Sequence, residues 1–279
     1  MSGGIMQRRA HNGTVAIMIA LSIVGFWVTI AVLGPFVAPH TEGSVVSPDV
    51  FAPVSAAFPL GTDYLGRDML SRVLFGARDT IGVALLATFL ACLVGGTLAL
   101  CAAVRGGWTD AMLSRVMDAL ISVPSLLFGL VVIAALGSSI PVLVGTAAVI
   151  YAPGAYRTAR ALAVNIAAMD FIRVARARGE RTVFIMGGEI LPNMLLPLLT
   201  DSGLRFIYVV LLLSGLSFLG LGVQPPQADW GSLVRENIEG LAYGAPAVIM
   251  PAVAIATLTI SVNLLIDNLS GRRRGADAG

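Results

Sequence analysis

The most informative part of the 279-residue chain reads Asp170-Phe171-Ile172-Arg173-Val174-Ala175-Arg176-Ala177-Arg178-Gly179 and continues, after nine further residues, with Glu189-Ile190-Leu191-Pro192-Asn193. Residues 161–178 contain no Gly or Pro and many Ala, which favours a short helix. Gly179 is expected to end that helix, because glycine tolerates positive φ. A second short helix is expected over 180–190, before Pro192 starts the next element.

Long apolar runs lie on both sides of this basic segment. The chain is 57% hydrophobic and 12% charged, whereas a soluble domain carries about 25% charged residues. Each run exceeds the length that a membrane-spanning strand needs, so helices are expected. Gly137 to Pro141 divide the longest run into two spans. The predicted spans, about six in all, cover 15–38, 80–104, the two halves of 119–156, 197–222 and 245–266. The sequence therefore predicts an all-α integral membrane protein.

The distribution of arginine sets the orientation of these spans. All 18 basic residues are Arg. With the N-terminus in the cytoplasm, inner segments carry 13 of them and outer loops carry 4, while Arg205 falls in a span. Both termini are then cytoplasmic. The predicted parts are a tail 1–14, a first span 15–38, a periplasmic segment 39–79, a five-helix core 80–266 with a cytoplasmic loop 157–196, and a tail 267–279.

The residue inventory excludes several kinds of chemistry. Without lysine the chain has neither a nucleotide-binding P-loop nor a Schiff-base amine. Cys92 and Cys101 lie too far apart on one helix to form a disulfide, and His11 and His40 are distant from each other, so no metal cluster is expected. A net charge of +2 gives no nucleic-acid footprint. We expect no catalytic residue, metal or cofactor on this chain.

The basic segment resembles the cytoplasmic signature of ABC importer permeases: Glu-Ala-Ala, three residues, Gly, nine residues, then a hydrophobic and Leu-Pro pattern. Gly179, Leu191 and Pro192 match in identity and spacing, and Ala175 matches the second Ala. Arg173 stands in place of the Glu and Val174 in place of the first Ala. The resemblance implies that the segment docks on an ATPase subunit through Arg173, Ala175, Arg176, Ala177, Gly179, Leu191 and Pro192. A basic segment lying on anionic lipid is the alternative interpretation.

Two further stretches resemble the C-type permeases of the peptide/nickel group. The first is Ser217 to Pro226 with Asp229-Trp230-Gly231, and the second runs from Leu60 to Asp68 and on to Arg78. In the first, Gly220 and Gly222 would permit close approach of another backbone, at a gate or a partner permease. Pro225 and Pro226 would stop the helix, and Trp230 would anchor at the membrane interface. A simple exit turn is the alternative.

The remaining expectations concern single side chains. In the second stretch, Thr62 or Asp63 caps a short helix, and Asp68 pairs with Arg72 four residues later. That stretch is either an amphipathic helix at the outer interface or a contact with a gate or binding protein. Asp201 and Arg205, also four residues apart, can pair within a span. The small polar residues Ser214 and Ser217 either contact the solute along the translocation path or pack against a neighbouring helix.

The resemblance implies the type I ABC importer permease fold in a bacterial inner membrane. A second, homologous permease subunit would complete the pathway, two ATPase subunits would hold ATP and Mg, and a periplasmic solute-binding protein would deliver the solute. The chain itself would be no enzyme, and its remaining partner is the lipid bilayer. Dipeptides, oligopeptides and nickel chelates are among the solutes of this group, and the sequence does not choose between them. The alternative is a secondary transporter or a channel subunit without an ATPase partner, which would normally carry intramembrane carboxylates or histidines as relays.

Overall fold

The computed structural model describes the backbone of residues 2–243 and 246–276 and the side chains of residues 15–242 and 247–268. Apart from two isolated bridges, regular structure in this part of the chain is helical. The helices are α1 (Ser2–Val37), α2 (Met69–Arg105), α3 (Gly107–Ile121), α4 (Ser125–Leu136), α5 (Ile140–Ala167), α6 (Asp170–Ala177), α7 (Thr182–Phe184), the π-helix η1 (Ile185–Ile190), α8 (Leu191–Phe218), α9 (Trp230–Glu236), the 3-10 helix η2 (Ile238–Tyr243) and α10 (Pro246–Ala276).

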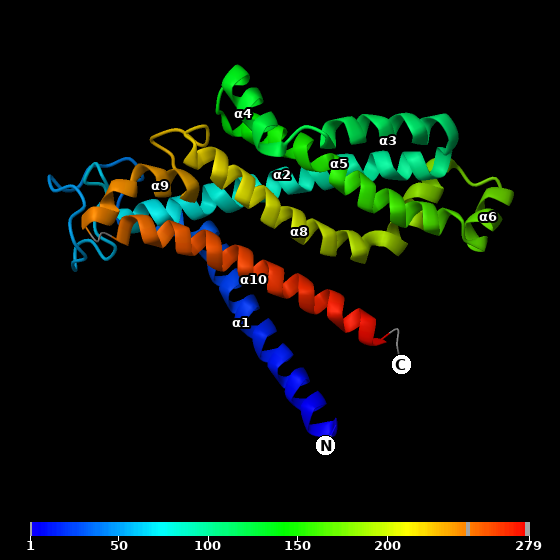
Figure 1. Ribbon diagram of the computed structural model, residues 1–279, viewed down its shortest axis with the longest axis horizontal. Coiled ribbons are helices and arrows are strands. Elements are labelled where there is room, and N and C mark those ends of the chain that lie inside the picture. The colour runs from blue at the N-terminus through cyan, green and yellow to red at the C-terminus, as the bar shows by residue number, and fades with distance from the viewer. Residues whose placement is uncertain (1, 244–245, 277–279) are drawn as a thin grey trace.

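The long helices agree with the predicted membrane protein of about six spans. Among the described residues, four helical stretches are long and apolar enough to cross a bilayer: Val15–Val37, Met69–Arg105, Thr182–Phe218 and Ala247–Asn268. The pair α3 and α4 makes a fifth when its two helices are taken together. Helix α5 has 28 residues and runs beside α2 (Figure 1), and at about 1.5 Å per residue it is also long enough to span.

The third span is bent, which the sequence analysis did not foresee. Helices α3 and α4 meet at 84° across Ser122–Pro124, because Pro124 has no N–H with which to continue the helix. The predicted break at Gly137 to Pro141 is confirmed. Helix α4 ends before Gly137, whose φ is +86°, and α5 begins at Ile140.

Helix α2 begins at Met69 rather than near residue 80, because Asp68 caps it. The Asp68 carboxylate accepts hydrogen bonds from the backbone N–H and the hydroxyl of Ser71, at 3.1 and 2.5 Å. The expected cap at Thr62 or Asp63 is therefore wrong, and these residues lie in a non-helical segment. The expected Asp68–Arg72 pair is also wrong, since Arg72 pairs with Asp63 and Glu236 instead.

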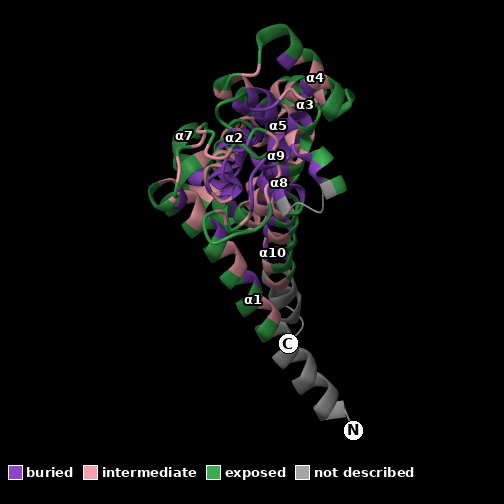
Figure 2. Cartoon of the chain, turned by 90° about the vertical axis from the view of Figure 1, so that its left-hand side faces the viewer, coloured by how far each residue is buried: buried purple, intermediate pink, exposed green. Residues whose placement is uncertain are grey.

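Two buried clusters hold the bundle together, and they lie toward its opposite ends. One surrounds Trp230, which is fully buried, with Trp27 of α1 at 4.8 Å between ring centroids. The other contains Tyr156, Ile172 and Met194. Figure 2 shows the buried residues gathered along the centre of the bundle, while α1 leaves it at an angle. The expectation that Trp230 anchors at the membrane interface is wrong: its indole N–H donates to the carbonyl of Val73 at 3.1 Å inside the core.

The ends of the chain fall partly outside the described residues. Side chains of the predicted tails are described only for residues 267 and 268. The backbone of α1 begins at Ser2 and that of α10 continues to Ala276, so both flanking spans extend helically into the predicted tails. The predicted last span starts at residue 245, which lies outside the described backbone.

Candidate functional site

Helix α6 carries the basic segment at one end of the bundle (Figure 1). Ile172 and Ala175 face inward and are 0% and 1% exposed. Gly179 ends the helix with φ +78°. Its N–H donates to the carbonyl of Arg176 at 3.0 Å, and the N–H of Glu180 donates to that of Ala175 at 3.2 Å, a glycine-dependent termination. The expected helix end at Gly179 is confirmed, although the helix begins only at Asp170.

The two expected small residues of α6 face opposite ways. Ala175 packs inside the chain's own core, so its small side chain lets α6 approach α5 and η1 closely. Ala177 is exposed, together with the basic residues around it. We call the outward surface of this region the α6 face; it consists of Phe171, Arg173, Val174, Arg176, Ala177, Arg178, Arg181, Val183 and Phe184.

Charge pairing leaves part of the α6 face unneutralised. Arg173 lies 3.5 Å from Asp170, and Arg178 lies 3.8 Å from Glu180. The guanidinium groups of Arg176 and Arg181 have no hydrogen bond or ion pair with the described residues. Four apolar side chains lie beside these cations, with exposures from 41% at Phe171 to 78% at Val183. An exposed surface that mixes aromatic, aliphatic and arginine side chains is suited to contact with another macromolecule.

A continuous helical stretch joins the α6 face to the middle of the bundle. Helices α7, η1 and α8 follow one another from Thr182 to Phe218 without a break. The prediction that a separate helix ends before Pro192 is therefore wrong. The π-helix accommodates this proline: the N–H of Leu191 donates to the carbonyl of Met186, five residues earlier, and Pro192 follows in the first turn of α8. Leu191 is half-buried and Pro192 is exposed.

An ion pair fixes α8 against α5 within the bundle. Arg205 Nε lies 2.6 Å from Asp201 Oδ2, which confirms the predicted pair. Arg205 Nη2 also donates to Thr158 Oγ1 at 3.2 Å, and Arg205 is 9% exposed. Gly154 makes room for the guanidinium, since a Cβ there would lie 2.5 Å from Nη1. A buried charge with this many partners links the two helices firmly.

Glycine rather than proline ends α8 at the opposite end of the bundle. Gly220 has φ +89°, and the N–H groups of Gly220 and Leu221 donate to the carbonyls of Ser217 and Leu216, each at 2.9 Å. The expected stop at Pro225 and Pro226 is wrong, because these residues come after the helix has ended.

The close approaches made by the two glycines occur within the chain itself. A Cβ on Gly222 would collide with Ser217, and one on Gly220 would lie 3.0 Å from Arg235 Cζ. The resulting turn brings Val223 back over the end of α8, where its N–H faces the Asp229 carboxylate at 3.4 Å.

The two serines considered for the translocation path differ in their surroundings. Ser217 is 2% exposed and donates to Asp229 Oδ2 at 2.6 Å. Asp229 also caps α9 by accepting from the N–H of Ser232 at 3.0 Å, and burial raises its pKa. The Ser214 hydroxyl is buried and has no hydrogen-bond partner among the described residues. The hydroxyl of Ser217 is thus bound within the chain, whereas that of Ser214 is an unused donor.

A network of four charged side chains, three of them buried and Glu236 partly exposed, lies at the same end and was not predicted from the sequence. Asp63 Oδ2 accepts from Arg67 Nε at 2.6 Å and from Arg72 Nη1 at 2.8 Å. Glu236 Oε2 accepts from Arg67 Nη2 at 3.1 Å and from Arg72 Nη1 at 2.7 Å. The network ties the segment before α2 to α9. The four-residue spacing of Asp63 and Arg67 is a sequence signal for their ion pair. No sequence signal connects these residues to Glu236, which lies far away in the chain.

Comparisons with known proteins place these features in a family. A family model described as "binding-protein-dependent transport system inner membrane component" matches residues 83–275. The dipeptide transport system permease protein DppC of Alkalihalophilus pseudofirmus is 29% identical over 90% of this chain and 83% of its own length. The di/tripeptide transport system permease protein DppC of Pseudomonas aeruginosa is 30% identical over 94% and 88%.

Two further matches extend the comparison. The glutathione transport system permease protein GsiD of Pectobacterium atrosepticum is 31% identical over 77% of this chain and 71% of its own length. The crystal structure of an amino acid ABC transporter with histidines has a TM-score of 0.50 to this fold, with 19% identity, and covers 73% of this chain and 93% of that one. That likeness bears on the fold alone.

Proposed function

The chain belongs to the family of binding-protein-dependent transport system inner membrane components, and on that premise we propose that it is a permease subunit of an ATP-driven importer for peptides or related small solutes. It is a multi-pass inner-membrane protein, and its role is conduction rather than catalysis. The printed names of its relatives, which include dipeptide, di/tripeptide and glutathione transport, support this solute class.

The proposed assembly contains a second, homologous permease subunit, two ATPase subunits and a periplasmic solute-binding protein. ATP and Mg belong to the ATPase subunits, and this chain needs no cofactor of its own. The orientation follows the arginine distribution: the end with α6 faces the cytoplasm, and the end with α9 and the 39–68 segment faces the periplasm.

The α6 face is the observation that carries the proposal. It combines exposed apolar side chains with an unpaired Arg176, at the end of the bundle assigned to the cytoplasm. A groove on an ATPase subunit would cover the apolar residues, and acidic groups there would take the arginines in charge-assisted hydrogen bonds. A lipid surface would attract the arginines as well, but the family membership favours a protein partner.

Force would pass from this face into the membrane along one continuous helix. Ile172 and Ala175 pack α6 against η1, and η1 continues directly into α8. The Arg205–Asp201–Thr158 contacts then tie α8 to α5. A shift of α6 on ATP-driven closure of the partner would therefore move α8 and α5 together, and a packed helix interface with two arrangements can convert such a shift into gate opening.

Gentle purification of the full-length chain tests the docking directly. We expect an ATPase subunit to co-purify with the wild type and to be lost from the Arg176→Glu variant, because that change reverses an unpaired charge on the α6 face. Arg105→Glu, at the exposed end of α2, is the matched control and should retain the subunit. Equal recovery of the ATPase from both variants would contradict docking at the α6 face, and its absence from wild type would favour a transporter without an ATPase.

A further inference from the structure

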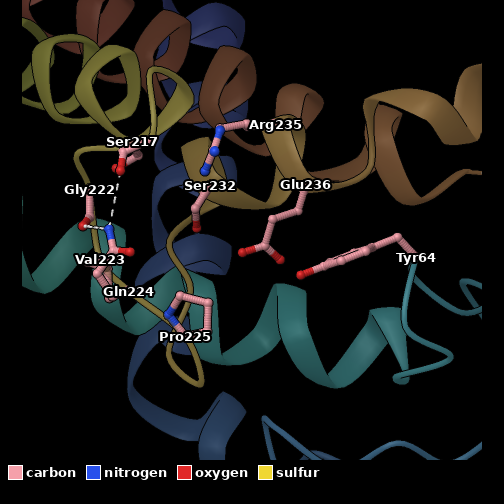
Figure 3. Close-up of a pocket in the computed structure, with 10 residues that line it drawn as sticks. Tyr64, Ser217, Gly222, Val223, Gln224, Pro225, Ser232, Arg235 and Glu236 are labelled. Atoms are coloured by element: carbon pink, nitrogen blue, oxygen red, sulfur yellow. Dashed lines mark hydrogen bonds between the residues drawn. The ribbon is translucent and has the colours of Figure 1, made fainter.

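A polar cavity of about 320 Å³ lies at the α9 end of the bundle, between the turn that follows α8 and the helix α9 (Figure 3). Its charged wall residues are Arg235 and Glu236, and Tyr64 and Gln224 add polar groups. A volume near 300 Å³ is at the small end of the range for ligand pockets. The cavity is therefore suited to a small polar molecule.

The cation in this cavity has no partner among the described residues. Arg235 is exposed on α9, and its guanidinium forms no hydrogen bond or ion pair with the described residues. Its guanidinium lies beside Gly220: a Cβ added to that glycine would be 3.0 Å from Arg235 Cζ. The missing side chain at Gly220 thus leaves space for the guanidinium to lie in the cavity wall, with its donors free for a carboxylate.

Unused acceptors occupy the other part of the wall. Both arginines that bind Glu236 use the same oxygen, Oε2, so Oε1 is left without a partner among the described residues. Figure 3 shows the Tyr64 hydroxyl and the Glu236 carboxylate pointing toward each other. The amide nitrogen of Gln224 donates to the carbonyls of Gly220 and Gly222, which leaves its amide oxygen free to accept.

We infer that this cavity is a receiving site for a small zwitterion, in which Arg235 binds the carboxylate while Glu236 Oε1 and the Tyr64 hydroxyl bind the ammonium group. The inference rests on the proposed import function, because it assigns to the permease itself a site for the free ends of a peptide or amino acid. The arginine network behind Glu236 holds that carboxylate in place without consuming its second oxygen.

The test uses dialanine, its C-terminal amide and N-acetyl-dialanine as probes. The full-length chain is placed in lipid nanodiscs with the subunits that accompany it, and binding is followed by saturation-transfer NMR. We expect the wild type to prefer dialanine over both capped forms. Arg235→Gln should weaken dialanine binding about tenfold and abolish the preference over the amide, since a charge-assisted hydrogen bond is lost. Tyr64→Phe should reduce only the preference over the N-acetyl form.

Arg78→Gln is the matched control, because Arg78 is exposed at the same end of the bundle but does not line the cavity. Unchanged binding in Arg235→Gln, equal binding of the amide by the wild type, or an equal loss in Arg78→Gln would each overturn the inference. Retention of the ATPase subunit by Arg235→Gln shows that the variant is folded. ATPase recovery and dialanine binding are measured separately. Loss of specific dialanine binding would therefore reject the cavity without rejecting the proposed function, and absence of the ATPase subunit from the wild type would reject the proposed function without deciding whether the cavity binds dialanine.

Discussion

At the scale of single residues, identical spacing led to opposite outcomes. Asp201 and Arg205 are four residues apart and pair, because both lie in the interior of α8 with their side chains on one face. Asp68 and Arg72 have the same spacing and do not pair, because the Asp68 carboxylate turns back to cap α2 at Ser71. Sequence spacing predicts a pair only when both residues already lie inside the helix.

A half-buried carboxyl near the α9 end gives a prediction at this scale. Glu42 Oε1 accepts from the N–H of Ala228 at 2.8 Å. Burial raises the pKa of Glu42 to about 7, helped by Asp79 and opposed by the Ala228 hydrogen bond, Arg72 and Arg67. Because the folded pKa lies above the unfolded value of 4.5, the stability contributed by Glu42 is complete below pH 4.5 and is lost as the pH rises through 7.

Glu42→Gln should remove this pH dependence, since glutamine resembles the protonated acid and still accepts from Ala228. The variant should melt higher than the wild type at pH 8 and equally at pH 4.5. Partial exposure reduces the expected difference to about 1 kcal/mol, or roughly 2–4 °C in Tm. Thermal denaturation of the detergent-purified proteins at both pH values measures this difference. A Tm difference between the two proteins that is the same at pH 4.5 and pH 8 would exclude the assigned titration of Glu42.

At the scale of elements, the helix ends that depend on neighbouring residues could be predicted from the sequence, whereas those that depend on residues distant in the chain could not. The end of α6 at Gly179 and the break at Gly137 follow from glycine's positive φ and were foreseen. The start of α2 at Met69 was not foreseen, because the span was placed on the charge-free run 80–104, which excludes Arg72. Asp63 and Glu236, contributed by other segments, neutralise it.

Gly179 offers a prediction at the scale of elements. Any side chain at φ +78° is strained, although the surrounding space is open. Gly179→Val should therefore disturb the end of α6 and the turn into α7, at a cost of about 1–3 kcal/mol confined to that turn. We expect solute uptake to fall by at least tenfold while membrane insertion is unchanged. Gly187→Val, at an open position in η1 with ordinary φ, is the comparison, and equal uptake by both variants would show that the turn at Gly179 does not matter.

At the scale of the whole molecule, the two ends of the bundle are chemically distinct. The α6 face lies at one end, while α9, the four-charge network and the zwitterion cavity lie at the other (Figure 1). Helix α8 runs from the first end toward the second and is tied to α5 on the way. Hydropathy predicted about six spans and the arginine distribution predicted their orientation, whereas the bend between α3 and α4 and the departure of α1 from the bundle depend on packing.

The central claim is that the α6 face binds an ATPase subunit in the cytoplasm, and a single cysteine tests it most directly. In a background with Cys92 and Cys101 replaced, Ala177→Cys places a thiol on the exposed face, and Leu65→Cys places one at the opposite end. We predict that Ala177→Cys cross-links to an ATPase subunit and resists a membrane-impermeant thiol reagent added outside the cell, whereas Leu65→Cys reacts with that reagent. Labelling of Ala177→Cys from outside, or no ATPase adduct in the assembled transporter, would contradict the account.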